Sequence, residues 1–235
     1  MTDKASVAQR EQLHGYALVE SLQRRFRTAA VEVTVNDRTF RILKPANPDD
    51  LIREEDFVKD ERLPYWADIW PSSTILAAKL LEMEGAGATA LELGCGVGLC
   101  TMAARIAGFD VLSTDYYEDS LDFTRANAFT NLGTEARTRL FDWRHPPADV
   151  GRYDLVFASD VLYEQEYAQL LPSIFDRTLT PGGSALVADP GRVAAPLFVE
   201  ACVRSGLEAA KIETLPFESG EVRQRIDIYL VTRAP

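Results

Sequence analysis

The 235-residue chain is poor in histidine and cysteine, the side chains that most often bind zinc. It has two histidines, His14 and His145, and three cysteines, at positions 95, 100 and 202. The cysteines form no C-x-x-C pair and no even set. The sequence therefore indicates neither a metal site nor a disulfide framework.

The chain also lacks a long apolar run and an excess of positive charge. No stretch approaches the roughly 18 consecutive apolar residues of a membrane-spanning helix, and the N-terminus lacks a basic-then-apolar signal. The net charge of −11 at pH 7 disfavours a nucleic-acid-binding face and suits a cationic or small neutral ligand. We expect a soluble cytoplasmic protein with no membrane or nucleic-acid partner. The oligomeric state is left open.

The most informative segment is a glycine-rich loop that follows an apolar run. Residues 90–93 predict a buried strand, and glycines follow at positions 94, 96 and 98. Glycine allows a positive φ and admits a ligand where a Cβ atom would clash. A helical pattern from Leu99 places backbone amides and the positive end of a helix dipole near the loop.

A second apolar run ends in an acid at the same edge. Residues 111–114 predict a parallel strand, and Asp115 follows it. A carboxylate in this place can accept hydrogen bonds from both hydroxyls of a ribose. The pair of motifs therefore predicts a nucleoside-containing cofactor.

The loop differs from the dinucleotide pattern G-x-G-x-x-G, because Leu99 stands where the third glycine of that pattern would be. Glu92 lies two residues before the first glycine. Its carboxylate would repel a pyrophosphate and attract a sulfonium or an ammonium group. The loop thus favours a cationic nucleoside cofactor over a dinucleotide.

The remaining chain predicts alternating strands and helices. Core strands are expected at 89–94, 109–114, 136–141, 154–159 and 183–188, and helices at 98–107, 118–130, 164–178 and 194–205. A closing hairpin is expected at 207–215 and 225–232, around a charged loop at 216–224. This alternation predicts an α/β fold with a doubly wound, seven-stranded, mostly parallel sheet, in which the closing hairpin adds one antiparallel strand.

Residues 1–60 predict an extension that packs on a core domain at 61–235. The patterns in it favour a helix at 5–27, a hairpin with strands 31–35 and 39–43, and a surface loop at 45–61. Asn36-Asp37 would form the hairpin turn. A helix ending at Glu84 follows, with Ser72 or Ser73 as its expected cap.

The motifs resemble those of a known family. Glu92, the three glycines and Asp115 resemble motifs I and post-I of the class I S-adenosylmethionine (SAM) methyltransferases, which have a Rossmann-like fold. Further segments resemble the seven-β-strand lysine methyltransferases called methyltransferase family 16: Pro-Tyr-Trp-Ala…Trp-Pro at 64–71, Asp142-Trp143, the Asp-x-x-Tyr at 160–163, and Asp-Pro-Gly-Arg at 189–192. The branch that acts on the electron transfer flavoprotein β subunit is most similar. The resemblance covers about residues 60–192.

The resemblance implies SAM as cofactor and S-adenosylhomocysteine (SAH) as its product. Glu92, Gly94 and Gly96 would frame the methionine and ribose parts, and Asp115 would hold the ribose hydroxyls. Cys95 is expected only as a small filler of the loop, as is the cysteine at position 100.

The resemblance also implies an adenine site and an aromatic wall. Tyr116 would flank the adenine, Asp142 would accept its amino protons, and the backbone at Trp143 would read the ring edge. Trp66 and Trp70 would wall the cofactor or the acceptor channel, since aromatic faces attract a sulfonium or an ammonium.

The end of the fourth core strand is the expected catalytic edge. Ser159 would lie against the cofactor, Asp160 would attract and orient the acceptor amine, and Tyr163 or water would take its proton. Arg192 is expected in a surface salt bridge, with a carboxylate of the cofactor or substrate as the other possibility.

The function that the resemblance implies is N-methylation of a lysine in a protein substrate. A small-molecule amine such as nicotinamide is the alternative acceptor. A nucleic-acid methyltransferase and a non-catalytic SAM- or NAD-binding module fit less well. The sequence has no Asn/Asp-Pro-Pro-Tyr motif after the fourth strand and lacks the third dinucleotide glycine.

Overall fold

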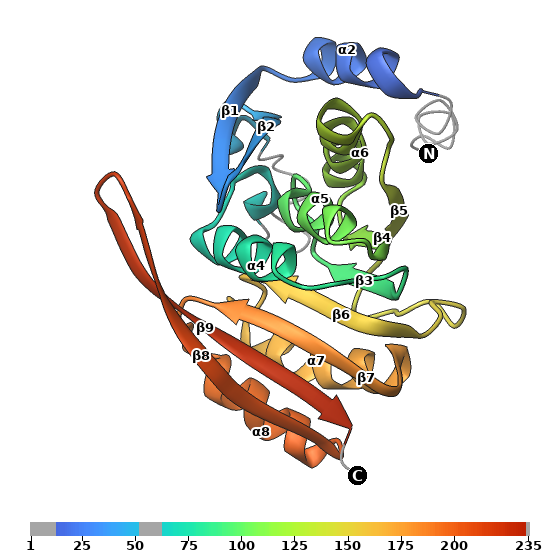
Figure 1. Cartoon of the computed structure of the whole chain (residues 1–235), viewed down its shortest axis with the longest axis vertical. Coiled ribbons are helices and arrows are strands. Elements are labelled where there is room, and N and C mark those ends of the chain that lie inside the picture. The colour runs from blue at the N-terminus through green and yellow to red at the C-terminus, as the bar shows by residue number, and fades with distance from the viewer. Residues whose placement is uncertain (1–12, 52–62, 234–235) are drawn as a thin grey trace.

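The computed structural model describes residues 13–51 and 63–233, and a seven-stranded sheet forms their centre (Figure 1). The strand order is β5-β4-β3-β6-β7-β9-β8. The strands are β3 (Thr89–Leu93), β4 (Asp110–Asp115), β5 (Arg137–Leu140), β6 (Tyr153–Ser159), β7 (Leu179–Asp189), β8 (Leu207–Ser219) and β9 (Val222–Arg233). Because only β9 runs antiparallel to its neighbours, the predicted mostly parallel α/β sheet is confirmed.

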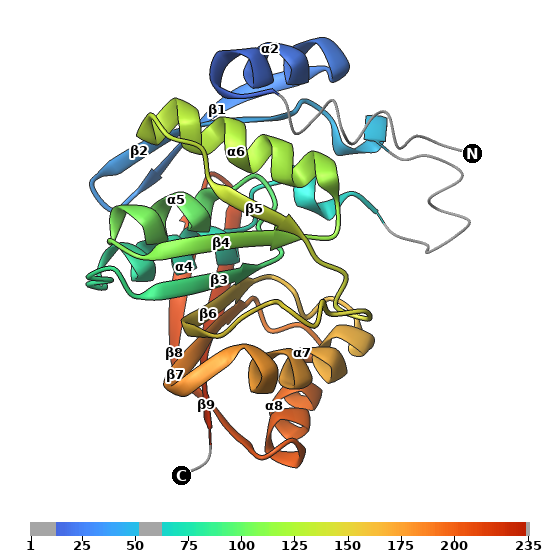
Figure 2. The same cartoon turned by 90° about the vertical axis from the view of Figure 1, so that its right-hand side faces the viewer.

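Helices cover both faces of this sheet (Figure 2). They are α4 (Pro71–Leu81), α5 (Leu99–Ile106) and α6 (Glu118–Leu132) on one face, and α7 (Gln165–Thr178) and α8 (Ala195–Arg204) on the other. In β3, Ala90 packs with the first group and Leu91 with the second, as expected of a strand buried on both sides. No helix in the described part of the chain has both the length and the apolar character needed to cross a bilayer.

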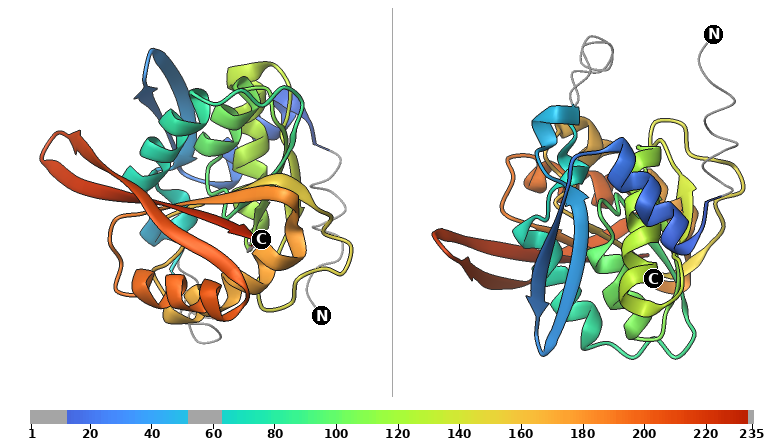
Figure 3. Two further views of the ribbon diagram at one scale, coloured as in Figure 1. Left: turned by 60° about the horizontal axis from the view of Figure 1, so that its bottom comes forward. Right: turned by 90° about the horizontal axis from the view of Figure 1, so that it is seen from above.

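The N-terminal extension lies beside α6 (Figure 3). It consists of α2 (Gly15–Arg25), β1 (Thr28–Val35), β2 (Arg38–Pro45) and the short helix η1 (Pro48–Leu51). The predicted hairpin is confirmed, and Asn36 has the positive φ of 53° that tight hairpin turns require. Residues 5–12 of the predicted helix and 52–61 of the predicted loop lie outside the described residues.

The predicted cap of α4 was wrong. The helix begins at Pro71 with Trp70 as its N-cap, because proline lacks the N–H that a first helical turn leaves unpaired. Ser73 lies within the helix, where its Oγ donates a hydrogen bond to the Trp70 carbonyl at 2.7 Å. Ser72 also lies in the first turn, and its hydroxyl faces Asp160.

The predicted charged loop at 216–224 was also wrong, because β8 and β9 continue through it into a projecting hairpin (Figure 1). Glu218 pairs across the strands with Arg223, and opposite charges at such positions stabilise a sheet. Phe217 packs partly against the core. Beyond Phe217 the two strands are exposed and carry no apolar alternation, so the sequence pattern did not reveal them.

Candidate functional site

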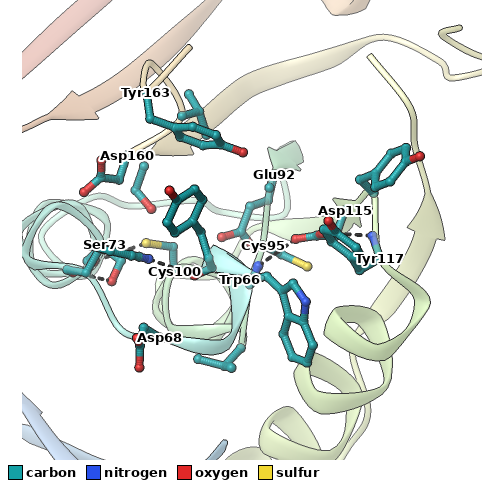
Figure 4. Close-up of a pocket in the computed structure, with 18 of the residues that line it drawn as sticks. Trp66, Asp68, Ser73, Glu92, Cys95, Cys100, Asp115, Tyr117, Asp160 and Tyr163 are labelled. Carbon is teal, nitrogen blue, oxygen red and sulfur yellow. Dashed lines mark hydrogen bonds between the residues drawn. The ribbon is translucent and has the colours of Figure 1, made fainter. Parts of the chain in front are cut away.

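A pocket lies at the carboxyl ends of β3, β4 and β6 (Figure 4). All of the predicted site residues line it: Trp70, Glu92, Gly94, Gly96, Asp115, Tyr116, Asp142, Trp143, Ser159, Asp160 and Tyr163. The described lining also includes Asp68 and Glu164 but no lysine, arginine or histidine. The pocket therefore suits a cationic ligand and disfavours a phosphate.

The glycine loop needs its glycines for backbone geometry. Gly94, Gly96 and Gly98 have φ values of 74°, 55° and 90°. A Cβ atom on Gly96 would lie 3.2 Å from the Trp66 carbonyl, and one on Gly98 would lie 3.0 Å from the Thr124 side chain. These close approaches are to the chain itself, so the glycines fix the shape of the loop as well as leaving its surface open.

Asp115 lies at the floor of the pocket and is 6% exposed. Its Oδ2 accepts the Gly96 N–H at 3.0 Å, and its Oδ1 accepts the Tyr117 N–H at 3.1 Å. Burial raises the pKa of Asp115, and these backbone hydrogen bonds oppose the rise. The carboxylate is therefore fixed in place where it lines the pocket.

Glu92 lies beside Asp115 and is also buried. The Thr101 hydroxyl donates a hydrogen bond to it, and that hydroxyl contacts Ser113 Oγ at 2.7 Å. Burial raises the pKa of Glu92 to about 8. A cation bound nearby would favour the ionised form, so this acid can respond to the charge of a ligand.

The predicted adenine side of the pocket contains Asp142 and Trp143. Asp142 Oδ1 accepts the backbone N–H of Arg144 at 3.0 Å and its Nε–H at 3.1 Å. Burial alone would raise the pKa of Asp142, but the hydrogen bonds from Arg144 outweigh it and lower this pKa to about 2. Asp142 is therefore an ionised acceptor whose orientation is set by Arg144.

Asp160 is paired with Arg192; the sequence predicted a salt bridge of Arg192 but not its partner. Arg192 donates from Nε and Nη2 to Asp160 Oδ1, at 2.9 and 2.7 Å. The Asp160 side chain is 4% exposed and that of Arg192 36%. Asp160 has a positive φ of 54°, and the backbone strain that this implies is common at functional sites. Burial raises the pKa of Asp160, which the pairing with Arg192 opposes.

The turn after β7 positions Arg192. Asp189 Oδ1 accepts the N–H groups of Gly191 and Arg192 at 2.8 and 2.6 Å. The guanidinium carbon of Arg192 lies 5.8 Å from the ring centre of Trp70. Arg192 therefore links the turn after β7 to Asp160 and Trp70, and the expected salt bridge is half-buried rather than superficial.

A chain of aromatic rings lines the other side of the pocket. Tyr163 contacts Tyr65 and Tyr167 edge-on, with centroids 5.3 and 5.2 Å apart. Tyr167 also contacts Trp143 at 5.2 Å, and Tyr65 contacts Trp70 at 6.0 Å. The sequence analysis missed Tyr65 and Tyr167, although the first lies in the Pro-Tyr-Trp segment and the second lies four residues after Tyr163.

Partial burial among these rings raises the pKa of the Tyr163 hydroxyl, so the phenol keeps its proton at neutral pH. Figure 4 shows the Asp160 carboxylate and the Tyr163 hydroxyl pointing away from each other. The two side chains therefore do not act as a hydrogen-bonded pair.

The sheet order, the glycine loop and the acid after β4 define the Rossmann-like fold of the class I methyltransferases. The magnesium protoporphyrin IX methyltransferase of Synechocystis PCC 6803, solved with bound SAM, shares it with a TM-score of 0.55 and 18% identity. That alignment covers 78% of this chain and 86% of the other, and it shows the fold alone.

Within this class, the chain belongs to the lysine methyltransferase family, whose sequence model matches residues 55–195. The electron transfer flavoprotein β subunit lysine methyltransferase of Danio rerio is 32% identical over 133 residues, 55% of this chain and 51% of that protein. Protein-lysine N-methyltransferase rrg1 of Schizosaccharomyces pombe is 29% identical over 139 residues, 52% of this chain and 46% of that protein. The chain thus spans about half the length of these relatives.

Proposed function

We propose that this protein transfers a methyl group from SAM to the ε-amino group of a lysine in a protein substrate. The observation that carries the proposal is the composition of the pocket, whose described lining combines six aspartate and glutamate side chains with eight tyrosine and tryptophan rings and no basic side chain. Asp68, Asp142 and Asp160 are paired with basic side chains outside that lining. Both reactants of such a transfer arrive as cations, a sulfonium and an ammonium. Carboxylates attract these groups through charge, and aromatic faces attract them through cation–π contacts.

The half of the pocket at β3 and β4 fits the cofactor. In the proposal, Asp115 holds the ribose hydroxyls, and Glu92 with the glycine loop receives the methionine part. Tyr116, Asp142 and the Trp143 backbone would receive the adenine. When bound, SAM would supply an electrophilic methyl group on a positively charged sulfur.

The half that follows β6 would receive the acceptor. Tyr65, Tyr163 and Tyr167 would guide a lysine ammonium inward through their ring faces and exclude water from it. Desolvation lowers the pKa of an amine, which favours the neutral form whose lone pair is nucleophilic. Orientation of that lone pair contributes most of the rate enhancement in a reaction of this kind.

Asp160 would orient the amine through its second oxygen. Its Oδ1 is occupied by Arg192, whereas Oδ2 accepts only a long contact of 3.4 Å from Ser72 among the interactions described for it. Because Tyr163 retains its own proton, the proton from the amine would leave through water. The protein substrate itself, the cytoplasmic location and the absence of a nucleic-acid partner stay predictions.

A transfer assay with methyl-labelled SAM tests the proposal. The purified protein is incubated with a recombinant electron transfer flavoprotein β subunit, with lysate proteins and with a mixture of small amines that includes nicotinamide. We expect label on lysine in a discrete protein band, located by mass spectrometry. Label confined to the small-molecule fraction would show that the acceptor is a small amine and not a protein lysine. No label in any fraction would overturn the proposal.

A further inference from the structure

One face of α6 is polar although it is fully buried. Ser120, Thr124 and Asn127 follow one another at helical spacing on this face, and each is 0% exposed. Ser120 and Thr124 donate hydrogen bonds from their hydroxyls to the Gly96 carbonyl at 2.7 and 3.0 Å. Asn127 Nδ2 donates to the Val97 carbonyl at 2.8 Å. None of these three side chains is among the described residues that line the pocket, so they support the glycine loop from behind.

Asn127 also binds the N-terminal hairpin. Its Oδ1 accepts the Leu43 N–H at 2.7 Å, and its Nδ2 donates to the Leu43 carbonyl at 2.9 Å. With the bond to Val97, both amide hydrogens and the carbonyl oxygen of Asn127 are used. One buried side chain therefore joins three segments: β2, α6 and the glycine loop.

Asn131, one turn further along α6, repeats only the hairpin half of this arrangement. Its Oδ1 accepts the Arg41 N–H at 2.9 Å, and its Nδ2 donates to the Arg41 carbonyl at 2.9 Å. Asn127 and Asn131 are four residues apart on α6, a rise of about 6 Å, and their partners on β2 are two residues apart, a rise of about 6.8 Å. The two asparagines can therefore each bind one of two alternate residues of β2. The remaining hydrogen bond of Asn131 goes to the backbone of α6 and not to the loop.

We propose that Asn127 is a positioning residue through which the N-terminal hairpin sets the cofactor affinity of the glycine loop. The loop amide of Gly96 donates to Asp115, so a displacement of the loop also displaces the carboxylate that would bind ribose. The inference rests on the proposed function, since it requires the loop to bind SAM or SAH. Coupling between two sites is reciprocal, so the bound cofactor should in turn stabilise the hairpin.

Asn127→Ala and Asn131→Ala form a matched pair, because both remove two hydrogen bonds to β2 and only the first removes the bond to the loop. We expect both variants to lower the thermal stability. In calorimetric titrations with SAH, we expect Asn127→Ala to weaken binding about tenfold and Asn131→Ala by less than about twofold, as loss of one buried hydrogen bond to the loop implies. Equal SAH affinities of the two variants would overturn the inference.

The effect of SAH on hydrogen exchange in the hairpin is a second measurement, and a loss of stability alone does not change it. The amide of Arg41 keeps its Asn131 partner in the Asn127→Ala variant. In the wild-type protein, we expect SAH to slow hydrogen exchange of this amide. In the Asn127→Ser and Asn127→Ala variants, we expect SAH to leave the exchange rate of the amide unchanged. Equal slowing in wild type and variants would refute the coupling. Failure of SAH to bind the wild-type protein would instead refute the proposed function, and the inference with it.

Discussion

The proposed cofactor half of the pocket, at β3 and β4, is held in place differently from the proposed acceptor half, which follows β6. In the cofactor half, Asp115 and Glu92 are 6% and 3% exposed and are fixed by backbone and hydroxyl donors. In the acceptor half, Tyr65 and Tyr163 are 41% and 40% exposed. Under the proposed function, the buried acids would bind one constant ligand, and the exposed rings would meet part of a larger molecule. Mutations should therefore separate cofactor affinity from acceptor turnover.

The largest expected effect is on cofactor affinity. Asp115→Ala removes a charged acceptor of two hydrogen bonds, each worth about 1.5–3 kcal/mol, so we expect the SAH affinity measured by calorimetry to fall by at least about a hundredfold. Asp110→Ala is the matched control, because Asp110 begins the same strand, carries the same charge and is exposed. Equal affinities of the two variants would contradict the ribose role.

The ion pair of the acceptor half should behave as one unit. Asp160→Asn and Arg192→Gln each remove one charge of the pair and leave the other side chain without an oppositely charged partner. We expect each variant to lower kcat/KM for a lysine substrate. The double variant should be no worse than the poorer single variant, with a coupling energy of about 1–3 kcal/mol. SAH affinity should change little in all three. Strictly additive losses in the cycle would mean that the pairing does not contribute to turnover.

Tyr163 tests whether the aromatic ring or the hydroxyl matters. We expect Tyr163→Ala to lower kcat/KM about tenfold, through loss of cation–π and ring contacts of about 1–2 kcal/mol. Tyr163→Phe keeps the ring and should retain most activity, because the phenol does not give up its proton at neutral pH. A larger loss in the Phe variant than in the Ala variant would argue for a chemical role of the hydroxyl.

A separate effect, on stability rather than on activity, is a pH dependence that originates in Glu92. Its pKa is raised from 4.5 to about 8, so the folded protein binds more protons than the unfolded chain between these values. The free energy of unfolding should therefore fall as pH rises through this window, and this contribution should be constant below and above it. Glu92→Gln should remove that part of the slope in denaturant titrations. An unchanged slope would show that Glu92 does not carry the extra proton.

The sequence predicted those features of the fold and site that depend on local pattern. Apolar runs ending in Gly94, Asp115 and Asp160 mark the carboxyl ends of parallel strands. These ends meet at one edge of the sheet however the connecting helices pack. The roles of Asp115 and Glu92 followed from the chemistry of the motifs, and the other roles within the pocket came from the resemblance to a family.

Features that depend on distant contacts were not predictable. Arg192 reaches Asp160 across 32 residues, and only the turn at Asp189 directs it there. Asn127 looks like an ordinary polar helix residue, because its burial depends on a hairpin that is 84 residues away in sequence.

A crystal structure with SAH tests the central claim most directly, namely that this pocket binds the adenosyl cofactor through Asp115. The account predicts the ribose hydroxyls within hydrogen-bonding distance of the Asp115 carboxylate and the sulfur facing the rings of Tyr65 and Tyr163. Nucleoside density elsewhere on the molecule, or no density in this pocket at saturating SAH, would contradict it.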